Sequence, residues 1–247
     1  MIASLPMYDR PTTVAANDRY WKAIREDIGD GPDRLTRDHD LFAQWLAPDL
    51  VFSQTCGLPF RARLHDKVTY VGTPDFGLRG CPPGYYRSVI VVRKDEPRSR
   101  LADFAGATCA RNDALSQSGW AALLGHLEMD DATGFFGAVR DTGAHGRSAE
   151  AVASGAADIA AIDAVTWLLL KRETDVAGQL RVIARTRPTP GLPYITARGR
   201  DPERLFEASG RALERLSGHD RARLLIKGVV RIPVDAYLAE PIPAREN

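Results

Sequence analysis

Short apolar runs of strand composition alternate with stretches of helical periodicity along most of the chain. The runs "LVFS" (50–53), "SVIVVRK" (88–94) and "DIAAI" (158–162) are rich in β-branched or small apolar residues and are bounded by turn residues, as buried strands are. Residues 17–28 and 201–216 instead repeat apolar side chains on one helical face. This alternation predicts βαβ units and therefore an α/β fold.

The alternation occurs in two separate runs, which predicts two lobes. Extended segments at Tyr85–Asp95 and Thr186–Arg198 join the runs, and 247 residues are enough for two compact bodies. We expect residues 1–88 with 196–247 to form one lobe and residues 89–195 the other. Each lobe is expected to contain a mixed, mostly parallel sheet with helices on both faces. The carboxyl ends of the strands would then border a ligand cleft between the lobes.

The composition excludes several classes of protein. Hydrophobic residues make up 44% and charged residues 26% of the chain, as in ordinary globular proteins. A net charge of +1 argues against nucleic-acid binding, and no apolar run approaches the roughly 20 residues that span a membrane. Cys56, Cys81 and Cys109 are odd in number, which predicts reduced thiols rather than a disulfide framework.

The N-terminus leaves the compartment open. The opening "MIASLPMYDR" lacks the basic start, the longer apolar stretch and the cleavage site of a secretory signal. If Met1 is the native start, we expect a cytoplasmic protein. If a leader has been removed, we expect a periplasmic or lipid-anchored one.

The stretch "RNDALSQSGWAALL" predicts an anion site at the start of a helix. Ser116, Gln117, Ser118 and Gly119 follow the predicted strand "ATCAR" and open the next helix. A helix start presents unpaired N–H groups and a partial positive charge, and Gly119 lets a ligand approach the backbone. The alternative is that Ser116 or Ser118 simply caps the helix.

A second group of polar residues follows in "DTGAHGRSAEAVASGAADIAAIDAVTW" (141–167). His145 lies in a glycine turn after a strand, where its charge would respond to pH near neutrality. Ser148 would cap the following helix, predicted over 148–154, or donate to a ligand. Asp163 ends the strand "DIAAI" and would face the same ligand. The alternatives are an exposed loop histidine and an aspartate that only caps a helix.

The first lobe offers a third group. Hydroxyl and amide side chains follow the predicted strand 50–53 at Ser53, Gln54 and Thr55. Tyr8 ends the first predicted strand and Tyr85 lies at the first crossing between the lobes. Aromatic rings with a polar tip suit the wall of a binding site, although tyrosines are equally common at half-buried positions.

Catalytic, cofactor and metal motifs are missing from the sequence. There is no H-E-x-x-H, P-loop, G-x-G-x-x-G or G-x-S-x-G. Cys56 has no base near it in sequence, so we expect an unreactive turn residue. "HLEMDD" (126–131) and His39 are expected to be a solvated turn and a polar helix start. We therefore expect no cofactor, no metal and no catalytic residue.

Three segments resemble the PhnD-like substrate-binding proteins of ABC importers for phosphate, phosphite and phosphonates. They are "SLPMYD", "SQSGWAALL" and "GAHGRSAEAVASGAADIAAIDAVTW", which occur in the family's order between Ser4 and about Arg198. The resemblance implies a type II periplasmic-binding-protein fold whose lobes close on a small oxyanion. It also implies that the cleft is lined by Tyr8, the Ser53–Thr55 turn, Ser116, Ser118, Gly119, His145 and Asp163.

We therefore expect a solute-binding protein, and not an enzyme, that captures a small anionic ligand such as a phosphonate or phosphate for import, with an ABC permease as partner. Two alternatives stay open, a cytoplasmic enzyme on the same two-lobed fold and a ligand sensor that serves a regulator. The expected ligand-binding residues are Tyr8, Ser53, Gln54, Thr55, Tyr85, Ser116, Gln117, Ser118, Gly119, His145, Ser148 and Asp163.

Overall fold

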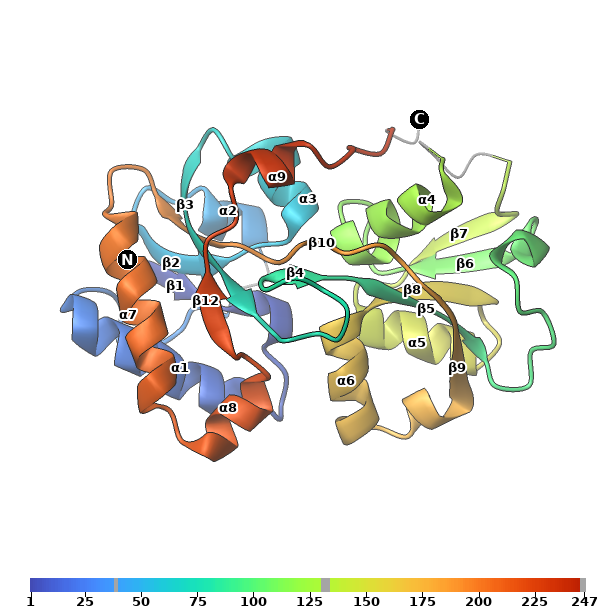
Figure 1. Cartoon of the computed structure of the whole chain (residues 1–247), viewed down its shortest axis with the longest axis horizontal. Helices are drawn as coiled ribbons and strands as arrows, with labels where there is room; N and C mark the ends of the chain where they lie inside the picture. The colour runs from blue at the N-terminus through green and yellow to red at the C-terminus, as the bar shows by residue number, and fades with distance from the viewer. Residues whose placement is uncertain (38–39, 130–133, 245–247) are drawn as a thin grey trace. The chain divides into compact units, whose positions relative to one another are not determined.

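A computed structural model describes residues 1–37, 40–129 and 134–244. The chain divides into two compact units, each treated separately below (Figure 1). Unit 1 consists of Met1–Tyr85 and Pro190–Ala239, and unit 2 consists of Tyr86–Thr189 and the chain from Glu240 onward.

The chain after Ala239 groups with unit 2, whereas the predicted lobes placed it with the first one. In this unit, Arg187 Nη1 donates to Glu240 Oε1 at 2.8 Å. At the two crossings between the units, β4 (Tyr85–Tyr86) is hydrogen-bonded to β10 (Thr189–Pro190).

Unit 1 is built on a mixed sheet with the strand order β1–β2–β11–β3–β12. β1 runs parallel to β2, while β11 is antiparallel to both β2 and β3, and β12 is antiparallel to β3. The elements are β1 (Ile2–Ser4), η1 (Pro6–Tyr8), α1 (Val14–Ile28), α2 (Leu41–Trp45), β2 (Leu50–Gln54), α3 (Gly57–Pro59), η2 (Phe60–Leu64), β3 (Val68–Asp75), β11 (Tyr194–Ala197), α7 (Pro202–Arg215), α8 (Gly218–Leu224), β12 (Gly228–Val230) and α9 (Val234–Leu238).

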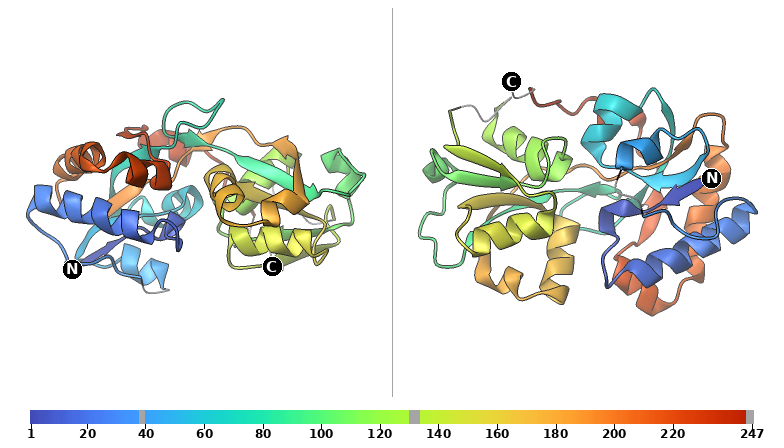
Figure 2. Two further views of the ribbon diagram at one scale, coloured as in Figure 1. Left: turned by 90° about the horizontal axis from the view of Figure 1, so that it is seen from below. Right: turned by 180° about the vertical axis from the view of Figure 1, so that it is seen from behind.

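Helices cover both faces of the sheet in unit 1 (Figure 2). On one face, Phe52 of β2 stacks on Trp21 of α1, with ring centroids 6.3 Å apart. On the other, Ile195 of β11 belongs to an apolar cluster with Trp45 of α2 and Phe60 of η2. The predicted start of α7 is confirmed, because the Asp201 carboxylate accepts hydrogen bonds from the first backbone N–H groups of that helix.

Unit 2 is built on a second mixed sheet with the strand order β7–β6–β8–β5–β9. β6 runs parallel to β7 and β8, while β5 is antiparallel to β8 and β9. Both sheets are mixed, as predicted, but most of their strand pairs are antiparallel rather than parallel. The elements are β5 (Ser88–Arg93), η3 (Leu101–Phe104), β6 (Thr108–Arg111), η4 (Gln117–Ala121), α4 (Ala122–Leu127), β7 (Ala138–Asp141), α5 (His145–Ala153), β8 (Ile159–Asp163), α6 (Ala164–Glu173), η5 (Val176–Gln179) and β9 (Leu180–Arg185).

The central strands of unit 2 are buried on both faces. In β8, Ala160 and Ile162 pack in one apolar cluster with side chains of α5 and α6, whereas Ile159 and Ala161 pack in another with side chains of η4 and α4. Successive side chains of a strand point to opposite faces, so a strand covered on both sides needs apolar residues at every position. This explains why the sequence of β8 is continuously apolar rather than alternating.

Three predicted element boundaries are wrong. The helix predicted over 17–28 begins at Val14. α5 begins at His145 rather than at Ser148, because Ala144 adopts the extended conformation of a helix cap and Ser148 N donates to its carbonyl at 2.9 Å. The run "FFGAVR" (135–140) predicts a strand from Phe135, but β7 begins at Ala138. A Cβ on Gly137 would lie 2.3 Å from the backbone oxygen of Gly106, so this part of the predicted strand packs tightly on a neighbouring turn.

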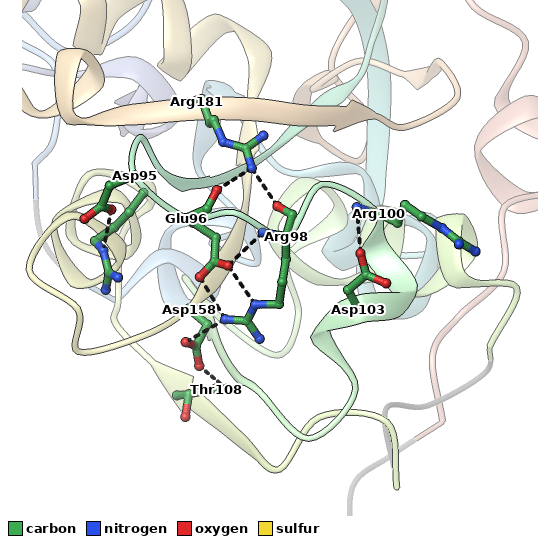
Figure 3. A network of polar contacts seen from close by, with 9 residues as sticks. Asp95, Glu96, Arg98, Arg100, Asp103, Thr108, Asp158 and Arg181 are labelled. Carbon is green, nitrogen blue, oxygen red and sulfur yellow. Dashed lines mark hydrogen bonds and ion pairs between the residues drawn. The ribbon is translucent and has the colours of Figure 1, made fainter.

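An ionic network fixes the segment that follows β5 (Figure 3). Glu96 accepts two side-chain hydrogen bonds from Arg98, at 2.8 and 2.9 Å. Arg98 also bonds to Asp158, whose other oxygen accepts from the backbone N–H of Thr108 at 2.8 Å. Arg181 donates to the backbone carbonyls of Glu96 and Arg98 at 2.6 Å. The network therefore ties this segment to the beginnings of β6, β8 and β9.

Among the residues that the structure describes, no helix has the length and apolarity that crossing a membrane requires.

We expect Glu96→Gln to lower the free energy of unfolding near pH 7 by roughly 2 kcal/mol. The Arg98 guanidinium lowers the pKa of Glu96 to about 2, against the opposing effect of its burial. Because this pKa is lower in the folded state, the stabilisation is present above the ordinary carboxyl pKa and is lost as the pH falls toward about 2. Urea denaturation at neutral and acidic pH measures the effect.

The matched control is Glu150→Gln, which removes the same charge from an exposed position on α5. Equal free energies of unfolding for the two variants near neutral pH would contradict the role given to Glu96.

Candidate functional site

The polar residues predicted in the second lobe lie at one edge of the unit 2 sheet, here called the polar edge. Since β6 is parallel to β7 and β8, the carboxyl ends of these strands share that edge. Residues 116–119 follow β6, His145 follows β7, and Asp163 ends β8. The topology of the sheet therefore brings to one edge residues that are far apart in the sequence, from Ser116 to Asp163.

The helix start after β6 holds two serines with different roles. Ser116 caps η4, and its hydroxyl accepts from the backbone N–H of Gly119 at 2.9 Å, which agrees with the capping alternative. Ser118 Oγ instead lies 2.8 Å from His145 Nε2 and forms a hydrogen bond between two site segments. Gln117 is also buried there. The capping alternative therefore accounts for Ser116 but not for Ser118.

His145 is neutral at physiological pH. Burial of the ring lowers its pKa to about 4, against a smaller opposing effect of the Ala161 backbone carbonyl. The prediction that its charge responds to pH near neutrality is therefore wrong, because it treated the ring as part of an open loop. The ring is half-buried at the first turn of α5, where it bonds to Ser118.

The structure assigns local partners to Ser148 and Asp163. Ser148 is fully buried in the first turns of α5, and its hydroxyl lies 2.7 Å from that of Thr142. It does not cap α5, because the helix begins before it. Asp163 is only 2% exposed, and its Oδ1 caps α6 by accepting from Thr166 N at 2.8 Å. Capping is thus part of the role of Asp163.

In unit 1, the three residues at the end of β2 are buried. The hydroxyl of Ser53 lies 2.7 Å from that of Ser4 and links β2 to β1. The side chain of Gln54 donates to the backbone oxygen of Leu192 at 3.3 Å. Thr55 donates its backbone N–H to the neighbouring strand segment. These bonds hold β2 in its sheet, and a ligand-binding role for the three residues stays a prediction.

The two candidate tyrosines of unit 1 differ in position. Tyr8 lies in η1, where its buried ring contacts the edge of Phe76 at a centroid distance of 5.2 Å. Tyr85 is half-buried in β4, at the first crossing. A ligand-binding role for either residue stays a prediction.

The cysteines and the possible metal ligands form no centre within the described residues. Cys56 and Cys81 are half-buried and Cys109 is buried, and none of the three is part of a disulfide among the described residues. No group of three or more His, Cys, Asp or Glu side chains in this part of the chain is arranged to hold a metal ion. His39 and residues 130–131, for which polar solvated structure was expected, lie outside the described residues.

Sequence reasoning missed several residues of the polar edge. Ser88 begins β5, lies beside Asp163 in the sheet register, and donates its hydroxyl to the Ser118 carbonyl at 2.8 Å. Thr186 follows β9 and accepts from the backbone N–H of Ser88 at 2.9 Å. Both residues lie at the polar edge because β5 runs antiparallel to β8 and β9. The sequence around β5 does not indicate the direction of the strand.

Arg111 and Asn112 were also missed. Arg111 is buried at the end of β6, where it donates to Asp141 at 2.7 Å and lies over the ring of Trp120, 4.6 Å from its centroid. It thereby joins the end of β7 to η4. The side chain of the next residue, Asn112, lies directly against Gly119, to which the His145 ring also lies close. The signal that could have found both is their place at the carboxyl end of a central strand.

Comparisons with known proteins identify relatives of this chain. The family model for the phosphonate-binding periplasmic substrate-binding proteins of ABC transporters matches residues 62–231. Among curated proteins, none matches the sequence.

Solved structures of this type are similar over nearly the whole chain. PhnD1 from Prochlorococcus marinus (MIT 9301), solved in complex with methylphosphonate, has 14% identity and a TM-score of 0.71, with 96% of this chain and 94% of that chain covered. XAC2383 from Xanthomonas citri, bound to ATP, has 18% identity and a TM-score of 0.69, with 96% and 92% covered. A binding protein component of an ABC phosphonate transporter (PA3383) from Pseudomonas aeruginosa has 15% identity and a TM-score of 0.69, with 96% and 82% covered.

These similarities confirm the predicted type II periplasmic-binding-protein fold and the predicted resemblance to PhnD-like proteins. Because the family model matches more than half of its length, this chain belongs to the family of phosphonate-binding periplasmic substrate-binding proteins of ABC transporters.

Proposed function

We propose that the polar edge of unit 2 binds a small phosphorus oxyanion, which the protein captures for import by an ABC-type permease. The observation that carries this proposal is the hydrogen bond between Ser118 and His145, which holds a hydroxyl at the start of η4 against the first residue of α5. Membership in a family of transport substrate-binding proteins supports the same role.

Ser118 and the nearby helix starts supply hydrogen-bond donors for an anion. In the unbound protein the Ala161 carbonyl favours a proton on Nδ1, so Nε2 accepts from the Ser118 hydroxyl. In the other tautomer, with its proton on Nε2, the ring donates to Ser118, and the Ser118 hydroxyl donates its own hydrogen to the ligand. We propose that a bound anion selects this tautomer. Hydrogen bonds to an ionised oxygen are stronger than those between neutral groups, and they are strengthened further away from bulk water. Backbone N–H groups at the starts of η4 and α5 would add donors.

Asp163 supplies the opposite kind of group. A buried carboxylate beside an anion repels it unless the ligand brings a hydrogen to share. We propose that Asp163 accepts from an O–H or N–H of the ligand, as a protonated oxyanion or an amine-bearing phosphonate would provide. Its bond to Thr166 uses Oδ1 and holds the carboxylate in place for this contact.

The solved relatives support a phosphorus-containing ligand. PhnD1 was solved with methylphosphonate, and XAC2383 with ATP. Both ligands contain phosphorus oxyanions, which differ in what is attached to the phosphorus. We propose the same anionic group as the ligand class for this chain. A contribution of Tyr8 and Gln54 in unit 1 to that ligand stays a prediction.

The Ser118–His145 pair also raises the alternative of an enzyme. A serine hydroxyl 2.8 Å from an imidazole nitrogen has the spacing of a nucleophile and its base, although the sequence suggested no such pair. We propose binding rather than catalysis, because a ring with a pKa of about 4 is a weak base. The backbone group that influences the ring is the neutral carbonyl of Ala161, whereas hydrolytic triads use a carboxylate.

We expect isothermal calorimetry to detect binding of at least one of phosphate, phosphite, methylphosphonate and aminoethylphosphonate. Ser118→Ala is expected to weaken that binding by about 10- to 100-fold, because it removes a hydrogen bond to a charged oxygen. The control is Ser154→Ala, which removes a hydroxyl from the end of α5, where it bonds only to the local carbonyl of Ala151. No heat with any of the four ligands would refute the oxyanion proposal.

We expect the His145 ring to stay neutral down to about pH 5 and to titrate near pH 4. The unfolded chain takes up this proton near pH 6.5. The free energy of unfolding therefore falls as the pH drops from about 6.5 to about 4, and His145→Gln removes that part of the loss. Nitrogen-15 NMR of the imidazoles and denaturation at several pH values measure the two effects. Titration of the ring near its ordinary pKa would contradict its burial.

We expect a phosphorus-based serine reagent such as diisopropyl fluorophosphate to leave Ser118 unmodified, because the weakly basic ring cannot activate the hydroxyl near neutral pH. Intact-protein mass spectrometry compares the wild type with Ser118→Ala, and a serine hydrolase serves as the positive control. Stoichiometric labelling that Ser118→Ala abolishes would favour the enzyme alternative.

A further inference from the structure

We propose that Asn112 is a further ligand-binding residue, whose side-chain amide donates to the same anionic group as Ser118. This inference rests on the proposed function and adds a residue that the sequence did not single out. Asn112 immediately follows β6, so it lies at the polar edge by the same topology as Ser118 and His145.

The amide of Asn112 lies at the centre of the residues that the proposed function uses. A Cβ built on Gly119 would lie 1.8 Å from Asn112 Oδ1 and 3.1 Å from His145 Cε1. Asn112, Gly119 and the imidazole therefore meet at one point, next to the Ser118–His145 hydrogen bond. The missing side chain at position 119 is what makes room for the amide.

The main chain is held in place at Asn112 and at the residue before it. The backbone carbonyl of Asn112 accepts from the N–H of Gly143 at 2.9 Å, which ties it to the turn before α5. The preceding residue, Arg111, is held by Asp141 and Trp120. A side chain attached to so constrained a backbone has few positions available, and in the one observed it faces Gly119.

The carbonyl oxygen of the Asn112 amide is not satisfied within the described part of the chain. Asn112 Oδ1 is buried and, among the described residues, has no hydrogen-bond partner. Asn112 itself is half-buried. A buried carbonyl oxygen without a donor is unfavourable and is rare outside functional sites. Reorientation of the amide or binding of a ligand would reduce this free-energy cost. The N–H groups of the amide are suitable hydrogen-bond donors for an anion.

Amide chemistry gives Asn112 a role that the other donors lack. A serine hydroxyl can donate or accept, and a neutral imidazole can do either, depending on the tautomer. The –NH₂ group of asparagine only donates, so once it faces the ligand it favours an anionic oxygen over a protonated one. Asn112 would donate to an oxygen of the ligand, and Asp163 would accept from an O–H or N–H of the ligand. These two opposite roles would orient the ligand.

The test measures affinity for inorganic phosphate, phosphite and methylphosphonate by calorimetry in the wild type and two variants. Asn112→Asp keeps the shape of the side chain but replaces the donor with a carboxylate, so affinity is expected to fall more than tenfold. Asn112→Ala removes the donor without adding charge and is expected to cost about three- to tenfold. The control, Gln179→Glu, makes the same amide-to-carboxylate change at an exposed position before β9 and should stay within twofold.

A second experiment tests the placement of the amide and does not depend on a ligand. Gly119→Ala is expected to lower the Tm, because its Cβ would overlap Asn112 Oδ1. Combining it with Asn112→Ala removes the overlapping group and should recover most of the Tm. Unchanged stability of Gly119→Ala alone, or no recovery in the combination, would show that the amide is not held against Gly119 and would overturn the inference.

The outcomes separate this inference from the function on which it rests. If the wild type binds a ligand and both Asn112 variants bind it within twofold, the inference is wrong and the proposed function stands. If Ser118→Ala and the Asn112 variants all weaken binding, both are supported. A wild type that binds none of the ligands would remove both, even if the Tm measurements confirm the placement of the amide.

Discussion

The burial of the unit 2 sheet on both faces is the constraint on which the site depends. Apolar side chains of β5 and β8 point alternately into two clusters, one beneath α5 and α6 and the other beneath η4 and α4. Polar groups cannot be accommodated within either layer without partners. They collect instead at the strand ends, where helices begin and backbone N–H groups are available. The location of the proposed anion site is thus a consequence of how the core is built.

At the polar edge, hydrogen bonds connect groups that come from different strands. The Ser118–His145 bond spans the segments after β6 and β7, and Ser88 reaches the Ser118 carbonyl from the start of β5. Each bond fixes a donor before a ligand arrives, which reduces the ordering that binding must otherwise impose. Burial also keeps His145 neutral. In the proposed function, the polar edge therefore binds its ligand through oriented dipoles and hydroxyls, and not through the charge of the imidazole.

The opposite end of the same sheet is held by charge. Glu96, Arg98 and Asp158 form an ion-pair network around the starts of β6 and β8. At the polar edge, Arg111 is neutralised by Asp141 and lies over Trp120. The guanidinium of Arg111 thus positions the segments after β6 and β7, which carry the proposed binding residues. The proposed hydrogen-bond donors to the ligand are themselves uncharged.

Much of this protein could be predicted from its sequence. Apolar runs and helical periodicity give the α/β class, and Ser118, His145 and Asp163 were expected at strand ends, because local hydrophobic pattern and helix-start chemistry are encoded by neighbouring residues. Helix and strand limits at Ser148 and Phe135 were wrong, since they depend on backbone contacts with Ala144 and Gly106.

The tertiary structure alone decided which groups meet. It placed Ser88 beside Asp163 through an antiparallel strand, paired Ser118 with His145, lowered the imidazole pKa by burial, and set the Asn112 amide against Gly119. These outcomes depend on contacts between residues far apart in the chain, whose distances no local pattern records.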